Sequence, residues 1–394
     1  MKKAAQFFSV QRRFQLFYLI QFAGVAIFMP YIALYLIEIG MSGAQVGILL
    51  GSMPLASFLV QPLWGLVSDI YGLRRVALTL GCLGVAIGTI IFGLVNQFRW
   101  LLLITLILSI IRSPIHPIIT ALALDYLEKE DRSDQFGSLR LWGSIGFIVT
   151  SFLIGGLIIG PTIKYIIQLY AIVMFILAAI SLTLPDAPID HQASWQEGLT
   201  LLRRQPNFLT FLLGALFVGM TLGVVNQYLA LYLKDIHAAG WMIGVAFGIS
   251  ALPEVPLMAL VPRMLNRWGL PTVLLGCLSL LPIRWLLYMQ IENPWWVLPT
   301  QLLHGVALTG VLVVAVIYVD RLLARHWRAT GQSLYTATQF GIGPSLGLFA
   351  AGYLYEFGGA SSIWLFCTII GVIGVVIVGW SMQMSTLSPI AERS

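Results

Sequence analysis

Long runs of apolar residues, separated by short polar or glycine-containing connections, recur along nearly the whole chain. Each run is long enough for a helix to cross about 30 Å of hydrocarbon, and a helix satisfies its own backbone hydrogen bonds in lipid. Prolines inside these runs, such as Pro54, Pro114 and Pro117, are expected to kink helices rather than end them. The pattern predicts twelve membrane-spanning helices, at residues 14–38, 43–68, 74–95, 100–126, 137–160, 163–184, 208–234, 240–262, 271–290, 295–320, 329–355 and 361–383.

The composition agrees with this pattern. Of 394 residues, 59% are hydrophobic and only 10% are charged, whereas a soluble domain carries about 25% charged residues. The mean hydropathy is +0.90. Three cysteines lie in apolar runs without a spacing that suggests a disulfide or a metal site. Because no phosphate-binding loop or nucleophile elbow occurs, neither an enzyme nor an ATP-driven pump is expected.

The positive charges indicate an orientation. If the N-terminus is cytoplasmic, 17 Lys and Arg residues fall on the cytoplasmic side and 3 on the other. The positive-inside rule therefore predicts that both termini are cytoplasmic. The net charge of +6 is interpreted as a basic membrane face and not as nucleic-acid binding. The sequence predicts an all-α, multi-pass protein of the cytoplasmic or inner cell membrane.

The longest polar stretch, 185–207, divides the predicted helices into two sets of six. Within it, Ser194 and Glu197 have the spacing of a capping box. We expect a short amphipathic helix on the cytoplasmic membrane surface. This linker would join an N-terminal six-helix bundle, 1–184, to a C-terminal one, 208–394.

An internal repeat supports two related halves. Shifting the sequence by 197 residues aligns Tyr31–Leu73 with Tyr228–Leu270, and 13 of 43 positions are identical. Both copies contain a Gly-x-x-x-Gly pair, a spacing that lets helix backbones approach closely. Duplicated halves are typical of transporters that work by alternating access, with the binding site at the interface of the halves.

The connection after the second predicted helix carries the pattern G-x-x-x-D-x-x-G-x-R-R. Its members are Gly65, Asp69, Gly72, Arg74 and Arg75. An ordinary cytoplasmic loop explains the arginines but not the spaced Gly-Asp-Gly. The pattern resembles the signature of the major facilitator superfamily. The resemblance implies two pseudo-symmetric six-helix bundles, and it gives these five residues a role in gating.

Further motifs narrow the resemblance, over the whole chain, to the branch of phenylpropionate permeases and relatives of lactose permease. They are the run from Gln135 to Phe147, Pro253–Pro256, Ile283–Trp285 and Leu303–Gly305. The resemblance implies a proton-coupled symporter of a small organic solute. We expect no cofactor other than the coupling proton, no partner other than the lipid bilayer and the solute, and a functional monomer.

Three ionisable residues of the second half fall inside predicted helices. An unpaired charge there costs about 2.5–3.5 kcal/mol. Arg284 and His304, in helices nine and ten, have the separation of an Arg and a His in lactose permease, where that pair belongs to the proton-coupling network. Lactose permease has a Glu three residues after its His. This chain has Ala307 at that position, and Glu254 of helix eight is the candidate replacement. We expect Glu254 to carry the proton, Arg284 to modulate the charge state of Glu254, and His304 to relay the proton or to contact solute. The alternative is that these residues only hold neighbouring helices together.

The first half supplies candidate solute contacts. Arg112 and His116 are four residues apart and are expected on one helical face; the alternative is a packing role beside two prolines. Arg140 and Phe147 resemble the Arg and aromatic residue that hold sugar in lactose permease. Phe147 has no indole N–H, and Thr120 replaces a carboxylate of related permeases; both differences weaken a sugar assignment. Asn226 is a further candidate lining residue.

Two carboxylates, Asp125 and Asp320, close helices four and ten and are expected to serve as cytoplasmic gate or cap residues. The solute is not identified by the sequence; aromatic acids, nucleosides and sugar-like molecules remain open. A proton-driven exporter or antiporter of hydrophobic compounds is the first alternative function. A membrane sensor that binds solute without moving it is the second, although its signalling segment is missing from the short loops.

Overall fold

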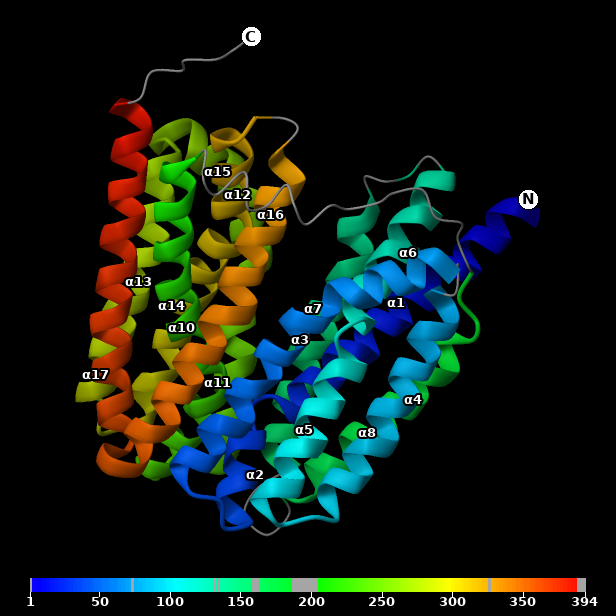
Figure 1. Cartoon of the computed structure of the whole chain (residues 1–394), viewed down its shortest axis with the longest axis horizontal. Helices are drawn as coiled ribbons and strands as arrows, with labels where there is room; N and C mark the ends of the chain where they lie inside the picture. The colour runs from blue at the N-terminus through cyan, green and yellow to red at the C-terminus, as the bar shows by residue number, and fades with distance from the viewer. Residues whose placement is uncertain are drawn as a thin grey trace. The chain divides into compact units, whose positions relative to one another are not determined.

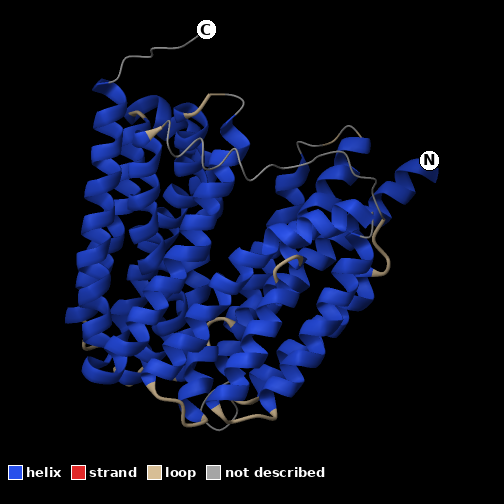
Figure 2. Cartoon of the chain, viewed as in Figure 1, coloured by secondary structure: helices blue, strands red, loops and turns tan. Residues whose placement is uncertain are grey.

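The computed structural model describes residues 2–71, 74–130, 132, 135–157, 163–185, 205–324 and 327–387. These residues form helices joined by short turns, and the described part of the chain contains no strand (Figure 2). Most of the predicted linker, residues 186–204, lies outside the described residues, and so do Gly72 and the side chain of Asp69.

The first half of the chain begins with α1, which a turn separates from the short α2 (Figure 1). A second interruption, at Ser113 and Pro114, divides the predicted fourth helix into α5 and α6, since proline cannot donate the regular helical hydrogen bond. Pro54 instead lies within the uninterrupted α3. The helices are α1 (Lys2–Phe28), α2 (Ile32–Glu38), α3 (Gly43–Tyr71), α4 (Arg74–Gly93), α5 (Phe98–Arg112), α6 (Ile115–Lys129), α7 (Phe136–Leu157) and α8 (Tyr165–Ser181).

The second half contains more irregular helices. A break at Leu252 and Pro253 separates α11 from α12, and two π-helical segments, η4 and η6, interrupt the helices that follow. The elements are α10 (Pro206–Asp235), α11 (Gly240–Ala251), α12 (Glu254–Trp268), α13 (Leu270–Gln290), η3 (Pro294–Trp296), α14 (Val297–Thr309), η4 (Gly310–Val314), α15 (Ala315–Leu322), α16 (Arg328–Ala337), η6 (Thr338–Ile342) and α17 (Gly343–Leu387).

Ten helical segments of the described chain are long and apolar enough to span a membrane, and α8 adds a shorter apolar helix. The last segment, Thr330–Met384, has 55 residues. Within it, Gly359 of α17 has a non-helical backbone, with φ 60° and ψ −163°. Because about 20 residues suffice for one crossing, this segment is long enough for two.

The chain divides into two compact units. One consists of Met1–Gln192 with Ala239–Gly248, and the other of Ala193–Ala238 with Ile249–Ser394. In the first unit α1 packs mainly against α7 and α8, and α4 against α8 and α5. In the second unit α10 packs along α17, which also covers α13 (Figure 1).

One packing contact occurs in both units at positions related by the 197-residue repeat. A Cβ atom on Gly146 of α7 would collide with the backbone carbonyl of Leu19 in α1. A Cβ atom on Gly343, 197 residues later, would lie 2.8 Å from the carbonyl oxygen of Leu216 in α10, and Leu216 is 197 residues after Leu19. The repeat therefore extends beyond the aligned segment into the way helices pack.

Candidate functional site

Arg284 and His304 meet inside the second unit. Arg284, on α13, is 1% exposed, and His304, on α14, is 7% exposed. The Arg284 Nη1 atom lies 2.8 Å from Nδ1 of His304. The two side chains are thus in direct contact, whereas a coupling role for the pair stays a prediction.

This contact defines which nitrogen of His304 holds a proton. A guanidinium has N–H donors and no acceptor, so Nδ1 of His304 must accept from Arg284. The neutral ring then carries its proton on Nε2. Protonation of Nδ1 would place two donors against each other, so His304 cannot take up a proton there and keep this hydrogen bond.

Two further polar side chains complete the contacts of Arg284. Its Nη2 atom donates to the Tyr288 hydroxyl at 2.6 Å and to Oε1 of Gln301 at 2.6 Å. The Nε2 atom of Gln301 donates to the same hydroxyl at 2.7 Å. Neither residue was predicted from the sequence. Tyr288 follows Arg284 by four positions and Gln301 precedes His304 by three, spacings that place side chains on one helical face and were the available signal.

Aromatic rings surround this polar group. The Cζ atom of Arg284 lies 5.0 Å from the centroid of the Trp285 ring and 5.1 Å from that of Tyr288. Trp285 stacks on Trp364 of α17 with centroids 5.6 Å apart and an interplanar angle of 15°. Tyr232 of α10 stacks on Tyr288 at 5.1 Å. We call Arg284, Trp285, Tyr288, Gln301, His304 and Trp364 the arginine cluster.

Glu254 is the first residue of α12, directly after the break at Pro253. The break lies against α14, because a Cβ atom on Gly305 would be 2.9 Å from the Ser250 carbonyl oxygen and 3.0 Å from Pro253. Since Gly305 follows His304, the start of α12 lies next to the arginine cluster. Glu254 is not among the described hydrogen-bond or ion-pair partners of Arg284.

A second group forms in the first unit around two aromatic residues of α1. The Tyr18 hydroxyl donates to Oγ1 of Thr120 at 3.4 Å. The Phe22 ring lies edge-on to His116, with centroids 6.2 Å apart, and Arg140 of α7 lies over Phe22 at 5.6 Å. Three predicted solute contacts, His116, Thr120 and Arg140, thus share one set of neighbours. Tyr18 and Phe22 were missed, because isolated aromatic residues in apolar helices carry no distinguishing pattern.

The remaining predicted solute contacts do not join this group among the described interactions. Arg112 ends α5 and lies beside the Tyr170 hydroxyl of α8. The break after Arg112 interrupts the continuous helix on which the shared face with His116 depended, so the two residues have different neighbours. Phe147 of α7 and Asn226 of α10 are half-buried; no described ring contact or hydrogen bond brings either to the two groups.

Ion pairs hold both carboxylates that were predicted to act in gating. Nη1 of Arg74 lies 2.6 Å from Oδ2 of Asp125, with the two side chains 13% and 30% exposed. Nη1 of Arg75 donates to the Leu184 carbonyl at 3.5 Å. In the second unit, Nη1 of Arg328 lies 3.3 Å from Oδ2 of Asp320, and both side chains are about half exposed. The gating roles stay predictions.

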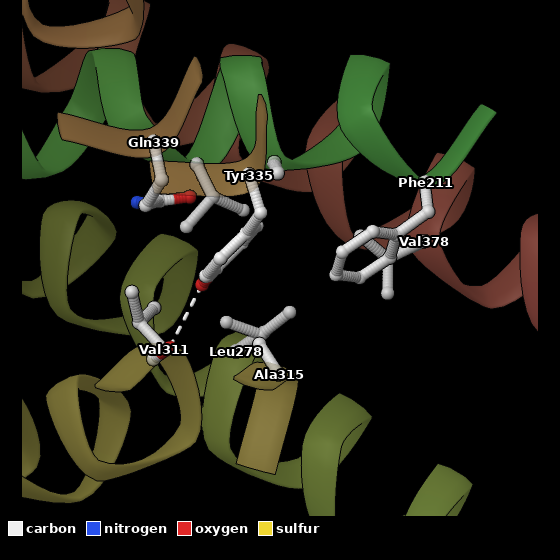
Figure 3. A pocket seen from close by; sticks show the side chains of 9 residues that line it. Phe211, Leu278, Val311, Ala315, Tyr335, Gln339 and Val378 are labelled. Atoms are coloured by element: carbon white, nitrogen blue, oxygen red, sulfur yellow. Dashed lines mark hydrogen bonds between the residues drawn. The ribbon is translucent and has the colours of Figure 1, made fainter. Parts of the chain in front are cut away.

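A small apolar cavity lies elsewhere in the second unit (Figure 3). The space between its lining residues that is not filled by atoms amounts to about 200 Å³. The Tyr335 hydroxyl crosses it to donate to the carbonyl of Val311, in η4, at 2.8 Å. Gln339, in η6, is 1% exposed, and its Nε2 atom has no hydrogen-bond partner. Both π-helical segments therefore line one cavity.

Comparison with known proteins gives consistent matches. Residues 11–366 match the MFS_1 like family. The chain is 28% identical to the maltose permease of Geobacillus stearothermophilus over 369 residues, covering 93% of each chain. It is 27% identical to a probable 3-phenylpropionic acid transporter of Escherichia coli, covering 89% of this chain and 93% of that one.

A solved structure shows the same fold. The crystal structure of the nucleoside transporter NupG matches with a TM-score of 0.82 at 20% identity, covering 95% of this chain and 98% of that chain. These proteins are transporters by name, and the names differ in the solute they give.

Proposed function

Because the chain belongs to the MFS_1-like family of major facilitator transporters, we propose that it moves a small organic solute by proton-coupled symport through alternating access. The observation that carries this proposal is the buried contact of Arg284 with His304 at 2.8 Å. Such a pair at membrane depth is expensive and marks ion or solute pathways. The proton is the proposed coupling ion.

The proposed architecture has twelve crossings in two six-helix bundles, 1–184 and 208–394, with both termini cytoplasmic. Two observations support it. The repeat extends to the matched contacts of Gly146 and Gly343, and the segment Thr330–Met384 holds residues for one crossing on each side of Gly359. The distribution of Lys and Arg residues, 17 on the proposed cytoplasmic side and 3 on the other, supports this orientation. The cytoplasmic or inner cell membrane is the proposed location.

In the proposed cycle, Glu254 takes up and releases the proton beside the arginine cluster. Arg284 biases the charge state of Glu254, and His304, whose Nδ1 atom accepts from Arg284, offers its Nε2–H group as a contact to the solute. The group around Tyr18 and Phe22, with His116, Thr120 and Arg140, supplies solute contacts in the first unit. Its guanidinium, hydroxyl and imidazole groups suit an anionic or hydroxyl-rich solute.

Uptake by proteoliposomes with an imposed pH gradient tests this function. We expect accumulation of one solute, from a panel of aromatic acids, nucleosides and maltose, only when protons flow inward with it. Accumulation driven by proton flow in the opposite direction would show an exporter or antiporter and contradict symport. Binding without flux of any panel member, under either gradient, would contradict transport.

A further inference from the structure

The charge of Arg284 has no negative partner among the described residues. Its hydrogen-bond partners are an imidazole nitrogen, a phenol and an amide oxygen, all of them neutral acceptors. The two aromatic faces at 5.0 and 5.1 Å add cation–π stabilisation without adding a charge. A buried cation is normally paired with an anion, because taking it out of water costs several kcal/mol. The arginine cluster therefore carries an excess positive charge.

The cluster also has an excess of hydrogen-bond donors. Arg284 Nε and the indole Nε1 atoms of Trp285 and Trp364 are all buried without a partner. Both tryptophans are fully buried, and Arg284 is 1% exposed. A guanidinium and an indole offer N–H groups only. All three unpartnered atoms thus require an acceptor, because a buried donor without a partner destabilises the folded state.

We propose that the arginine cluster binds the carboxylate of a small organic anion, with Arg284 as its charge partner. A carboxylate supplies the missing charge and two acceptor oxygens with about four lone-pair sites. Charge-assisted hydrogen bonds of this kind are about twice as strong as neutral ones. A neutral amide of the same shape brings one acceptor and two more donors, and so matches the cluster in neither respect.

This inference rests on the proposed transport function, since it names the class of solute. It favours organic acids over nucleosides and neutral sugars. It also gives Arg284 a direct role, whereas the proton-coupling proposal has Arg284 acting through Glu254. Movement of the anion together with a proton would keep the net charge that crosses the membrane small.

The test compares carboxylates with their amides on the purified, full-length protein. Acetate, benzoate and 3-phenylpropionate are each paired with acetamide, benzamide and 3-phenylpropionamide at constant ionic strength and about pH 7.5, where the acids are ionised. The readout is the ligand-dependent rise of the thermal unfolding midpoint, which measures binding. We expect at least one carboxylate to bind tenfold or more tightly than its amide. Equal responses within every pair would overturn the proposal.

A variant pair assigns the effect to the cluster. Arg284→Gln should abolish the preference for the carboxylate, while Arg99→Gln, at an exposed position on α5, should leave it unchanged. If both variants keep the preference, the anion binds elsewhere and the proposal is wrong. If Arg284→Gln does not fold, Trp285→Phe provides the second variant. It keeps a ring but removes an indole N–H, and it should weaken carboxylate binding several-fold without changing amide binding.

Flux measurements separate this inference from the proposed function. Binding of a carboxylate without uptake into proteoliposomes would support the anion site and contradict transport. Uptake of a nucleoside or maltose, with no carboxylate binding, would support transport and contradict the anion site.

Discussion

Gly40 and His237 occupy the same left-handed backbone conformation, 197 residues apart, with φ of 93° and 58°. Each follows a helix of the repeated segment and closes it in the same way. The amide of Gly40 donates to the Ile37 carbonyl, and that of His237 to the Lys234 carbonyl, both at 3.0 Å. Glycine adopts this conformation without steric cost, whereas a residue with a Cβ does not.

His237→Gly should therefore stabilise the protein by about 1 kcal/mol, because it removes the cost of a left-handed residue that bears a Cβ atom. The measurement is the midpoint of thermal unfolding in detergent. His237→Ala keeps the Cβ atom and serves as the control, with no gain expected. Gly40→Ala should destabilise by a similar amount, although nothing lies within 4 Å of the added atom. A gain for both His237 variants would attribute the effect to the imidazole instead of the backbone.

The ion pair of Arg74 with Asp125 should contribute more to stability than that of Arg328 with Asp320. The first is shorter, at 2.6 against 3.3 Å, and more buried. The measurement is the free energy of unfolding in double-mutant cycles that combine Arg→Gln with Asp→Asn. The coupling energy should be about 1 kcal/mol for the first pair and less than about 0.5 kcal/mol for the second. The exposed pair is the matched control. Equal coupling energies would contradict the argument from burial.

Glu254→Gln should abolish uphill accumulation driven by a pH gradient, because it removes the titratable carboxyl group and keeps the side-chain size. Exchange of labelled solute between equal pools should persist, since it requires no net proton movement. Both are measured in proteoliposomes. Accumulation at the wild-type stoichiometry would assign the proton to another group, with His304 and Asp320 as the next candidates.

Gly343→Ala should lower the free energy of unfolding of the protein by about 1–3 kcal/mol. The added Cβ atom would lie 2.8 Å from the backbone oxygen of Leu216, and backbone atoms cannot easily move away. Gly276→Ala, in α13, is the matched control: nothing lies within 4 Å of its added atom. Since alanine favours helix over glycine, that variant should be neutral or up to about 1 kcal/mol more stable. Equal losses at the two positions would rule out the close approach as the cause.

The sequence predicted helices well where apolar length and charge determine them, as in α4, α10 and α13. It located Arg284 and His304 because charges are rare in such helices and therefore conspicuous. It did not locate Tyr288, Gln301 or Trp364, since tyrosine, glutamine and tryptophan occur in membrane helices for many reasons. Only the packing of α13 against α14 and α17 makes them neighbours.

Helix interruptions were harder to predict than helices. Pro54 is accommodated inside α3, whereas Pro114 and Pro253 coincide with breaks. All three are prolines within apolar runs, so the difference depends on what surrounds each one. The break at Pro253 bears on the proposed coupling role of Glu254, because Pro253 packs against Gly305, the residue after His304, and Glu254 follows Pro253 directly.

The π-helical segment η4 lies between His304 and Asp320 along one continuous helical path. A π turn accommodates one residue more than an α turn. If η4 adopted α-helical hydrogen bonding, every residue after it would change phase relative to His304 by one helical step, about 100° of rotation and 1.5 Å of rise. Asp320 and its contact with Arg328 would then turn to a different face of the helix. A change between π and α hydrogen bonding in η4 would therefore shift the register of α15 without unfolding the helix.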